Sequence, residues 1–342
     1  MRRVRFGSML YPAAFEDMIK QSRLMEQCGL DSLWFPDHIV FLNTNWIGLD
    51  AWCTLSALTN HVKRMTLGTA VTDPLRRHPA VFAQTVATLD QISKGRAVVG
   101  IGAGEAMNIV PFGIEYTKRV LRMRETIQVA RRLWTGKPID FHGEFYRLNN
   151  AFIQAIPCNR SLVPIYIAAN SPRTRKVAGE LGDGWIAQVM CPEKYRTDLK
   201  EVYEAAEKAD RDPSVIDIVY CSNLSISKDY DEARASAIAA TKQMFVWWPK
   251  QLERYGAWVD PSYDWNRLTV CEDTLEKCRR RSLGIPDEIA EQVSIFGRPR
   301  DCVDRISEYV RSGVNSFLFE IQSPLPESYD LLRREVLPFF AD

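Results

Sequence analysis

The stretch that decides the fold is Gly100-Ile101-Gly102-Ala103-Gly104-Glu105-Ala106-Met107-Asn108, which follows an apolar run beginning at Arg96. We expect a strand over Arg96–Gly102 and a glycine-rich turn after it. This turn carries a carboxylate and an amide at a strand end, where barrel enzymes keep their catalytic groups. Glycines let a flat ligand approach the backbone, and a Glu among apolar neighbours suits general acid–base work. The alternative is an ordinary strand-to-helix turn with a solvated Glu.

Strand-like and helix-like segments alternate outward from this stretch, as judged from apolar periodicity and capping signals. The expected strands are Val4–Met9, Ser32–Phe35, Met65–Val71, Arg96–Gly102, Pro164–Ala169, Trp185–Val189, Ile216–Ser225, Val293–Phe296 and Ser316–Ile321. The expected helices are Phe15–Cys28, Asp50–Thr59, Pro79–Ser93, Val120–Trp134, Arg173–Leu181, Pro192–Ala209, Arg300–Ser312 and Ser328–Phe339.

This alternation predicts an α/β fold with one (β/α)8 TIM barrel over residues 1–342 and irregular insertions at about 137–162 and 229–289. We expect a short hairpin around His142-Gly143-Glu144 in the first insertion. Two Rossmann domains are the competing architecture, which needs the spacing G-x-G-x-x-G after a strand. Because Glu105 or Met107 occupies the third glycine position, that fingerprint fails in both registers.

The composition points to a small-molecule partner. The 44 basic and 43 acidic residues leave a net charge of +1, which predicts no nucleic acid partner. The N-terminus lacks the apolar run of a signal peptide, and no stretch has the length of a membrane span, so we expect a cytoplasmic protein. The eight cysteines are scattered without metal-binding spacing, which predicts reduced thiols and no metal site.

Polar residues stand at the ends of several expected strands, where a barrel holds its site. Asp37-His38 follows the second strand, and an imidazole titrates near neutral pH, which suits proton transfer. The alternative is a structural His that caps the next element. Arg76-Arg77 is a candidate for binding an anionic tail, although such pairs more often form a solvated rim. Asn170-Ser171-Pro172 opens a helix whose free N–H groups suit a phosphate.

Several short motifs occur in a fixed order along nearly the whole chain. They are Asp37-His38, Gly68-Thr69-Ala70-Val71, Arg77-His78-Pro79-Ala80, Ala83-Gln84, Gly95-Arg96, Gly102-Ala103-Gly104-Glu105-Ala106-Met107-Asn108, Pro164–Ala169, Ala178-Gly179 and Gly182-Asp183-Gly184. In this order they resemble the bacterial-luciferase-like superfamily of barrel oxidoreductases, and within it the branch that uses the deazaflavin coenzyme F420. The segment around Glu105 is similar to secondary-alcohol and sugar-6-phosphate dehydrogenases. Val71–Pro79 and Phe112–Glu115 are more similar to phthiodiolone ketoreductases and methylene-tetrahydromethanopterin reductases.

The resemblance implies a set of cofactor and catalytic residues. It implies a non-prolyl cis peptide at Ala70-Val71, in a bulge that would back the deazaflavin ring. His38 and Glu105 would flank the substrate as the catalytic residues, and we expect a homodimer. The implied cofactor contacts are Asp37, Ala70, Val71, Thr72, Gly104, Asn108, Ala168, Ala169, Asn170 and Ser171.

Two positions depart from the pattern of this branch. Its dehydrogenases have a Trp four residues after the His, where this chain has Leu42, and Trp46 is the candidate substitute from a longer loop. The sugar-phosphate lysine expected after the sixth strand is replaced by Gln188-Val189-Met190-Cys191, so glucose-6-phosphate is not the expected substrate. The aromatic region around Trp247 and Trp248 would shape or cover an apolar substrate pocket.

We therefore expect an F420-dependent oxidoreductase that moves a hydride between C5 of the deazaflavin and a carbon of an alcohol/ketone pair. His38 would exchange a proton with the substrate oxygen and Glu105 with the cofactor ring, or the two would trade roles. The alternatives are a methylene-tetrahydromethanopterin reductase-like enzyme, an FMN-dependent luciferase-like monooxygenase, and a non-catalytic member that binds the coenzyme.

Overall fold

Eight parallel strands close into a barrel in the computed structural model of this protein, which describes residues 3–158, 163–257, 268–322 and 325–341. The barrel strands are β1 (Arg5–Met9), β2 (Ser32–Phe35), β3 (Thr66–Thr69), β4 (Ala97–Ile101), β7 (Ile165–Ala168), β8 (Gly184–Gln188), β9 (Asp217–Ile226) and β11 (Ser316–Ile321). The ring closes because β9 pairs with both β8 and β11, and β11 pairs with β1. The predicted (β/α)8 barrel is confirmed.

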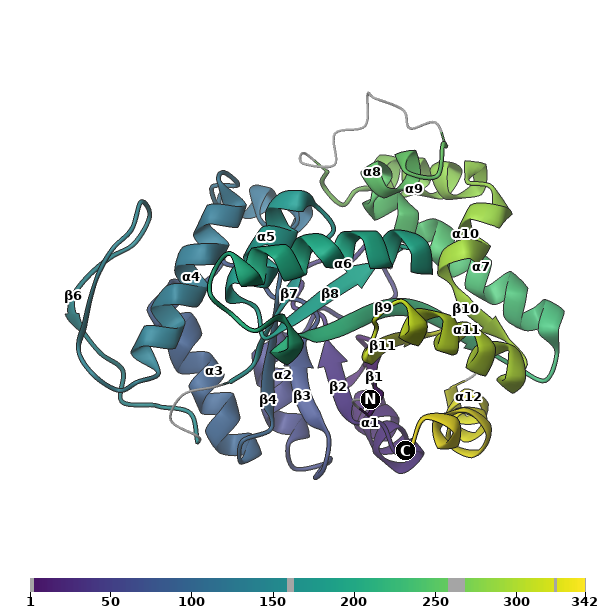
Figure 1. The fold of residues 1–342 in the computed structure, drawn as a ribbon, viewed down its shortest axis with the longest axis horizontal. Helices are drawn as coiled ribbons and strands as arrows, with labels where there is room; N and C mark the ends of the chain where they lie inside the picture. Colours follow the sequence, from purple (N-terminus) through teal and green to yellow (C-terminus); the bar gives the residue numbers. More distant parts are fainter. Residues whose placement is uncertain (1–2, 159–162, 258–267, 323–324, 342) are drawn as a thin grey trace.

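Helices cover the outside of the barrel (Figure 1). They are α1 (Phe15–Cys28), α2 (Ala51–Leu58), α3 (Pro79–Ser93), α4 (Arg119–Leu133), α5 (Pro172–Leu181), α6 (Pro192–Glu207), α11 (Pro299–Arg311) and α12 (Leu325–Leu331). Local signals fix the ends of α1 and α3, which have the predicted bounds. The first ends at Gly29, whose φ of 93° is left-handed, and the second begins with Pro79 at its first position.

The first insertion contains the predicted hairpin, formed by β5 (Ile139–His142) and β6 (Arg147–Ala151). Figure 1 shows it extending away from the barrel. The buried carboxylate of Glu125 on α4 holds its turn, because it accepts backbone hydrogen bonds from Glu144 at 2.7 Å and Phe145 at 3.1 Å.

The second insertion is helical and lies on one side of the barrel (Figure 1). It comprises α7 (Tyr230–Trp247), α8 (Pro249–Glu253), α9 (Glu272–Gly284) and α10 (Asp287–Val293). The short helices elsewhere are η1 (Ala106–Asn108) and η2 (Val110–Phe112) after β4, and η3 (Pro213–Val215) before β9. The insertion has an apolar cluster of its own, in which Val189 at the end of β8 packs with Phe245 and Ile289.

Two predicted elements differ from the structure. The strand expected at Val293–Phe296 is β10 (Ile295–Gly297), which pairs in parallel with β9 and lies outside the closed ring. The helix expected over Ser328–Phe339 is divided into α12, a π-helical turn at Leu332–Val336 and a 3-10 turn at Leu337–Phe340. Pro338 has no backbone N–H, so a regular α-helix loses a hydrogen bond at this point.

Side chains from alternate strand positions fill the barrel lumen. They are Trp34, Val98, Tyr166, Ile186, Val219, Cys221 and Leu318. The ring centroids of Trp34 and Tyr166 lie 5.7 Å apart, and this aromatic pair occupies much of the interior. Because the lumen is packed, ligands must bind at the carboxyl ends of the strands, as in other barrels of this type.

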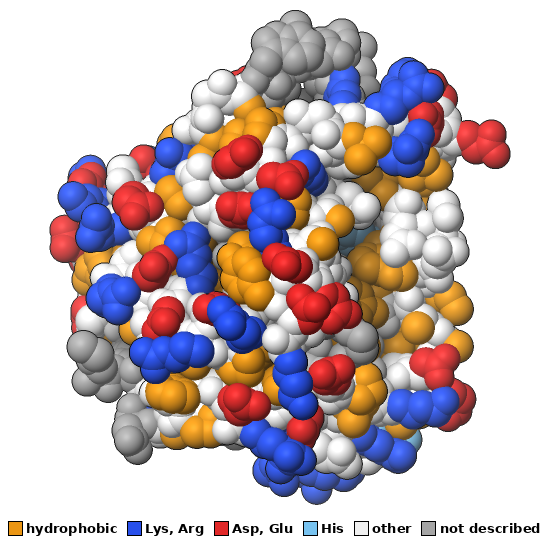
Figure 2. All heavy atoms as spheres, turned by 90° about the vertical axis from the view of Figure 1, so that its right-hand side faces the viewer, with side chains coloured by type: hydrophobic (Ala, Val, Ile, Leu, Met, Phe, Trp, Pro, Cys, Tyr) orange, Lys and Arg blue, Asp and Glu red, His pale blue; other side chains and the backbone are white. Residues whose placement is uncertain are grey.

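Directly after β3, the Ala70–Val71 peptide bond is cis, as the resemblance implies. Basic and acidic side chains are interspersed over the face shown in Figure 2, in keeping with the balanced composition. In the parts of the chain that the structure describes, no helix has the length and apolar character needed to cross a bilayer.

Candidate active site

The structure brings His38 and Glu105 together at the carboxyl end of the barrel. His38 follows β2 and Glu105 follows β4, with β3 between these strands in the sheet. The His38 Nε2 and Glu105 Oε2 atoms are 3.5 Å apart, and both side chains are partly exposed. An imidazole and a carboxylate at this separation can exchange a proton with each other or with a small molecule bound against them.

Three buried polar atoms in this cluster have no hydrogen-bond partner among the described residues. They are His38 Nδ1, Glu105 Oε2 and Asn108 Nδ2. A buried polar group without a partner costs about 1–3 kcal/mol, and native structures contain few of them. Their concentration at the carboxyl end of the barrel indicates that a polar ligand completes the hydrogen bonding here.

Asn108 links the two loops that carry the catalytic candidates. Its Oδ1 accepts backbone hydrogen bonds from Ile39 at 2.7 Å and Val40 at 2.9 Å, directly after His38. Its Nδ2 is the unpartnered atom of the same amide. Asn108 therefore fixes the loop that carries His38 and still presents a donor, consistent with its predicted role as a cofactor contact.

An aromatic wall runs from His38 around the barrel end. The ring centroids are 4.9 Å apart for His38 and Phe41, 5.3 Å for Phe41 and Trp46, and 5.6 Å for Trp46 and Tyr11. Trp46 therefore belongs to the same wall as the imidazole, and its role as the substitute for the missing Trp stays a prediction. Leu42 packs instead on an apolar cluster that contains Met107 after β4.

One oxygen of the Asp37 carboxylate is held by three side chains of the protein. Its Oδ2 accepts hydrogen bonds from Thr72 Oγ1 at 2.6 Å and from Arg77 Nη1 at 2.9 Å, and Arg76 Nη2 lies 3.1 Å away. Asp37 is 3% exposed. Asp37 and Thr72 thus hold each other in place, and their predicted contact with the cofactor stays a prediction.

The interpretation of Arg76-Arg77 as a solvated rim is wrong. Their side chains are only 10% and 19% exposed, because each guanidinium binds two carboxylates. Arg76 pairs with Asp73 as well as Asp37, and Arg77 pairs with Asp50 at 2.7 Å as well. With their charges compensated by the protein, the pair supports the site and does not offer a free anion-binding surface.

The glycines after β4 are required by the chain itself. A Cβ on Gly102 would lie 2.8 Å from Val71 Cγ2, and one on Gly100 would lie 2.1 Å from the Thr69 carbonyl oxygen. Ala70 and Val71 pack against the lumen cluster from this bulge. Gly104 has a φ of 82°, which favours glycine, and its carbonyl accepts a hydrogen bond from Tyr116 at 2.9 Å.

The predicted phosphate-binding segment lies between β7 and α5. Ala168 is partly exposed near Gly102, whereas Ala169 is buried in the outer core. The Asn170 side-chain oxygen accepts a hydrogen bond from the backbone of Gln188, and the Ser171 hydroxyl caps α5. The predicted cofactor contacts of this segment stay predictions.

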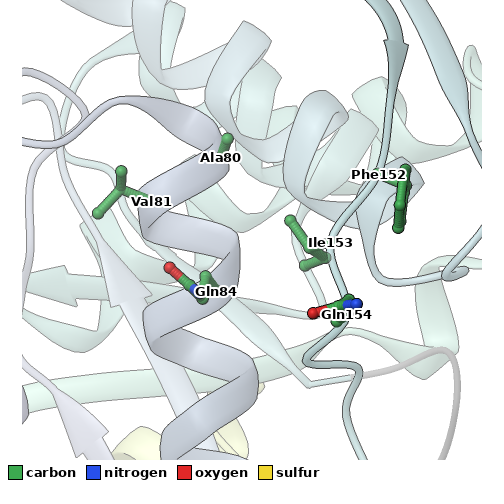
Figure 3. A pocket seen from close by; sticks show the side chains of 6 residues that line it. All are labelled: Ala80, Val81, Gln84, Phe152, Ile153 and Gln154. Carbon is green, nitrogen blue, oxygen red and sulfur yellow. The ribbon is translucent and has the colours of Figure 1, made fainter.

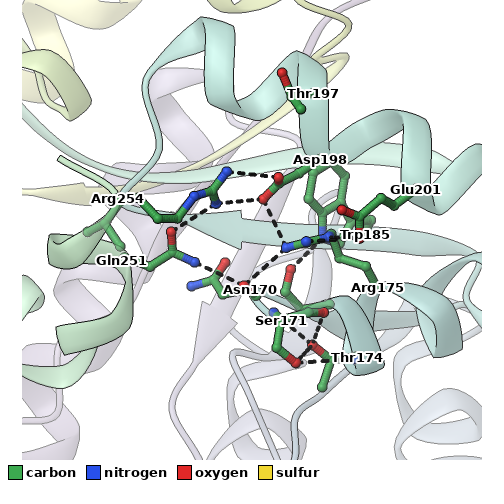
Figure 4. Close-up of polar contacts among 12 residues, drawn as sticks. Asn170, Ser171, Thr174, Arg175, Trp185, Thr197, Asp198, Glu201, Gln251 and Arg254 are labelled. Atoms are coloured by element: carbon green, nitrogen blue, oxygen red, sulfur yellow. Dashed lines mark hydrogen bonds and ion pairs between the residues drawn. The ribbon is translucent and has the colours of Figure 1, made fainter. Parts of the chain in front are cut away.

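A buried ion network that the sequence did not reveal fixes this segment (Figure 4). Asp198 on α6 binds Arg175 at 2.9 Å and Arg254 at 2.8 Å. The Asn170 carbonyl accepts hydrogen bonds from Arg175 at 3.1 Å and from Gln251 of α8 at 2.9 Å. The network therefore ties the second insertion to the end of β7. Charged residues inside amphipathic helices were its only sequence signal.

The two predicted pocket tryptophans lie at the junction of α7 and α8. Trp248 is partly buried and packs on the insertion's own apolar cluster. The side chain of Trp247 lies outside the described residues, as does much of the aromatic region after it. The described apolar contact between the insertion and the site is the cluster of Val246, Leu268 and Cys278 with Met107.

A groove of about 360 Å³ lies outside the barrel and away from His38, between α3 and the segment after β6 (Figure 3). It is lined by Ala80, Val81, Gln84, Phe152, Ile153 and Gln154. Val81 is 51% exposed and Phe152 57%. The groove has no titratable lining residue, so it is a surface for contact and not a site of proton chemistry.

The geometry can be compared with known proteins. A family model described as "Luciferase-like monooxygenase" matches residues 3–316. A 5,10-methylenetetrahydromethanopterin reductase of Archaeoglobus fulgidus is 29% identical over 347 residues, which cover 98% of this chain and 99% of the relative. An F420-dependent glucose-6-phosphate dehydrogenase 2 of Rhodococcus jostii is 32% identical over 315 residues, covering 89% and 87%.

A solved structure has the same fold over its whole length. It is an F420-dependent secondary alcohol dehydrogenase in complex with an F420-acetone adduct, and it superimposes with a TM-score of 0.84 at 25% identity. The match covers 99% of this chain and 100% of that one.

Proposed function

The chain belongs to the luciferase-like monooxygenase family, and from this premise we propose that it is an F420-dependent oxidoreductase acting on an alcohol/ketone pair. Enzymes with F420 as cofactor are among its relatives in both sequence and structure. The observation that carries the proposal is the unpartnered set of buried atoms on His38, Glu105 and Asn108. These atoms combine proton-exchanging groups with a hydrogen-bond donor at the carboxyl end of the barrel.

The residues around this cluster fit a flat, polar cofactor ring. Asn108 Nδ2 is a free donor for a ring carbonyl, and the bulge at Ala70 and Val71 offers an apolar surface beside it. The side chain of Ala168, which lies near Gly102, is small and takes up little of the space at this point. When bound, coenzyme F420 accepts or donates the hydride at its C5 atom.

The protein would handle the proton. As an alcohol loses hydride from its carbinol carbon, its hydroxyl proton must leave, and His38 Nε2 would accept it. Glu105 Oε2, 3.5 Å from Nε2, would stabilise the resulting imidazolium and receive the proton in turn. Ketone reduction would run the same transfers in reverse. The rings of Phe41 and Trp46, packed edge to face, would exclude water from this side of the reaction.

A second candidate is reduction of a methylene-tetrahydromethanopterin. Its support is the similarity to the Archaeoglobus fulgidus reductase, which extends over 98% of this chain. Both candidates use the same cofactor, and they differ in the substrate that lies against His38. Glucose-6-phosphate is disfavoured because Gln188 to Cys191 supply no cation for its phosphate.

The test begins with titration of the purified protein with F420 and, separately, FMN. We expect F420 to bind with a Kd of about 1 μM or lower, near −8 kcal/mol, and FMN to bind more weakly. Secondary alcohols, ketones and methylene-tetrahydromethanopterin are then screened against oxidised and reduced F420 by following the deazaflavin absorbance. Turnover with the pterin alone would favour the second candidate, and tighter binding of FMN would contradict the choice of cofactor.

We also propose that the enzyme works in the cytoplasm as a homodimer. The exposed apolar side chains of Val81 and Phe152 beside the outer groove (Figure 3) support a contact between copies, because such a contact would remove them from water. Light scattering of the pure protein would contradict the dimer if it gave the mass of one chain.

A further inference from the structure

Glu320 is a carboxyl group inside the barrel that the proposed chemistry does not use. Along β11, Phe317 and Phe319 pack in the outer core, whereas Leu318 belongs to the lumen cluster. Since side chains of a strand alternate between its two faces, Glu320 faces the lumen, one step above Leu318 toward the carboxyl end. It keeps some accessible surface, unlike the four residues around it, Leu318, Phe319, Ile321 and Phe317.

The groups that face Glu320 are polar but uncharged. Cys221 Sγ on β9 lies 3.9 Å from Glu320 Oε1, which is a long contact for a weak thiol donor. The Gln188 side chain on β8 donates to the same sulfur at 3.1 Å. On the β1 side, the Tyr11 hydroxyl donates to the Ile321 carbonyl at 2.7 Å and is thereby committed elsewhere. Among the described residues, no cation pairs with this carboxylate.

These surroundings favour the protonated form of Glu320. Burial raises the pKa of Glu320 to about 7, because removal from water disfavours the charged form and no positive group compensates. The facing titratable groups are Cys221 and Tyr11, whose pKa values burial and the nearby Glu320 raise well above their usual ranges. Both are therefore neutral near pH 7, so Glu320 is the group that titrates there.

Glu320 and His38 lie at two ends of the same aromatic wall. The Tyr11 ring, next to Glu320, packs on Trp46, and the Trp46 ring packs on Phe41 beside His38. The strands β11, β1 and β2, which carry these residues, are consecutive in the barrel. A molecule bound along this wall with its reacting carbon near His38 would reach toward Glu320.

We propose that Glu320 is a substrate-binding residue that hydrogen-bonds a second, non-reacting hydroxyl group of the substrate. The proposal rests on the proposed alcohol/ketone function and specifies its substrate class: a neutral diol or hydroxyketone, not a plain alkanol. A carboxylate without a cation repels anionic groups, so phosphate or carboxylate substituents at this end are disfavoured. A hydroxyl is the complementary partner, since it donates to the carboxylate and accepts from the carboxylic acid.

The test compares alkane diols, each with one secondary and one terminal hydroxyl, with the secondary alcohols of the same chain length. For the diol whose length matches the wall, we expect kcat/KM of the F420-loaded enzyme to exceed that of the alkanol by roughly tenfold or more, as for a hydrogen bond to a charged group. Because the carboxylate accepts more strongly than the acid, this preference should rise as pH increases through about 7.

Variants at position 320 separate the possible roles. Glu320→Leu should reduce the diol preference to within about twofold. Glu320→Gln should retain part of the preference and lose its pH dependence, since an amide hydrogen-bonds but does not titrate here. Glu335→Gln, the same change at an exposed carboxylate, should alter neither. Calorimetric binding of diols and alkanols to the F420-loaded enzyme gives the same comparison without turnover.

The outcomes distinguish this inference from the proposed function. If the wild-type enzyme prefers no diol, or if Glu320→Leu keeps the preference, the inference is overturned. If no alcohol turns over but calorimetry shows a diol preference that Glu320→Leu removes, the subsite stands and the alcohol/ketone chemistry falls.

Discussion

Asp37 and Glu105 are two carboxylates that follow barrel strands, and the protein treats them in opposite ways. Asp37 Oδ2 meets donors from Thr72, Arg76 and Arg77 within 3.1 Å. The Glu105 side chain is 31% exposed, and its buried Oε2 atom has no hydrogen bond among the described residues. A carboxylate whose donors all come from the protein stabilises the fold, whereas one that lacks donors is available to a reacting partner.

The largest expected effect is on turnover, from Glu105→Gln. The amide keeps the shape of the side chain but cannot hold the proton or stabilise the His38 imidazolium. We expect kcat to fall by about 10² to 10⁴, the range of general acid–base catalysis. F420 affinity and thermal stability should stay near the wild-type values, because the amide fills the same space and can still contact His38. Steady-state kinetics and thermal unfolding of the same preparation measure both effects.

Glu115→Gln is the matched control for this substitution. Glu115 lies ten residues later and pairs with Arg122 while its side chain remains 65% exposed. Turnover of this variant should be unchanged. If Glu105→Gln turns over at the wild-type rate, the lack of a hydrogen-bond partner at Glu105 Oε2 does not indicate a catalytic role. The proton chemistry would then be assigned to His38 alone.

The next largest effect is on stability, from Asp37→Ala. In this variant the buried guanidinium groups of Arg76 and Arg77 each lose one of their two carboxylate partners. Arg76 still pairs with Asp73, and Arg77 still pairs with Asp50. Breaking a buried ion pair from one side costs about 3–5 kcal/mol, and the remaining partners place the expected loss near the lower value. Denaturant unfolding in the absence of cofactor measures it.

The control here is Asp17→Ala, since the Asp17–Lys20 ion pair is 62% and 72% exposed. Exposed pairs contribute about 0–1 kcal/mol. Equal losses from the two variants would mean that the Asp37 network is no more than a surface cluster, and the contrast with Glu105 would disappear.

The sequence predicted what depends on neighbouring residues. The helix Pro79–Ser93 has its expected bounds because proline at the first position and the turn at Lys94-Gly95 are local signals. The sequence also indicates that His38 and Glu105 lie close together, because both follow strands whose carboxyl ends meet at one end of the barrel.

The sequence did not predict what depends on distant partners. For Arg76-Arg77 the sequence leaves a choice between an anion-binding pair and a solvated rim, because nothing nearby in the chain identifies Asp50 and Asp37 as partners. The strand β10 was found, but only the sheet order places it outside the ring. The sequence does contain a signal that singles out Glu320, because it is the one charged residue in the barrel strand Ser316–Ile321.

The last expected effect, on the pH dependence of stability, extends the comparison to Glu320, a carboxyl that has no cation beside it among the described residues. Its pKa is raised from 4.5 to about 7 in the folded protein. Between these values the native state holds a proton that the unfolded chain has released, so the free energy of unfolding falls as pH rises and levels off above pH 7. This difference in the pKa of Glu320 corresponds to about 3 kcal/mol in the free energy of unfolding. Glu320→Gln removes this dependence, so its stability relative to wild type should increase by about that amount between pH 4 and pH 8.

Urea unfolding of both proteins across this range measures the difference, and contributions from other carboxylates cancel because both proteins share them. Glu335→Gln should follow the wild-type curve, since an exposed carboxylate has water in both states. A constant difference between Glu320→Gln and wild type at every pH would mean that Glu320 ionises as freely in the barrel as in solution. The lumen would then supply it with donors, as the protein does for Asp37, and Glu320 would not be available to a substrate hydroxyl.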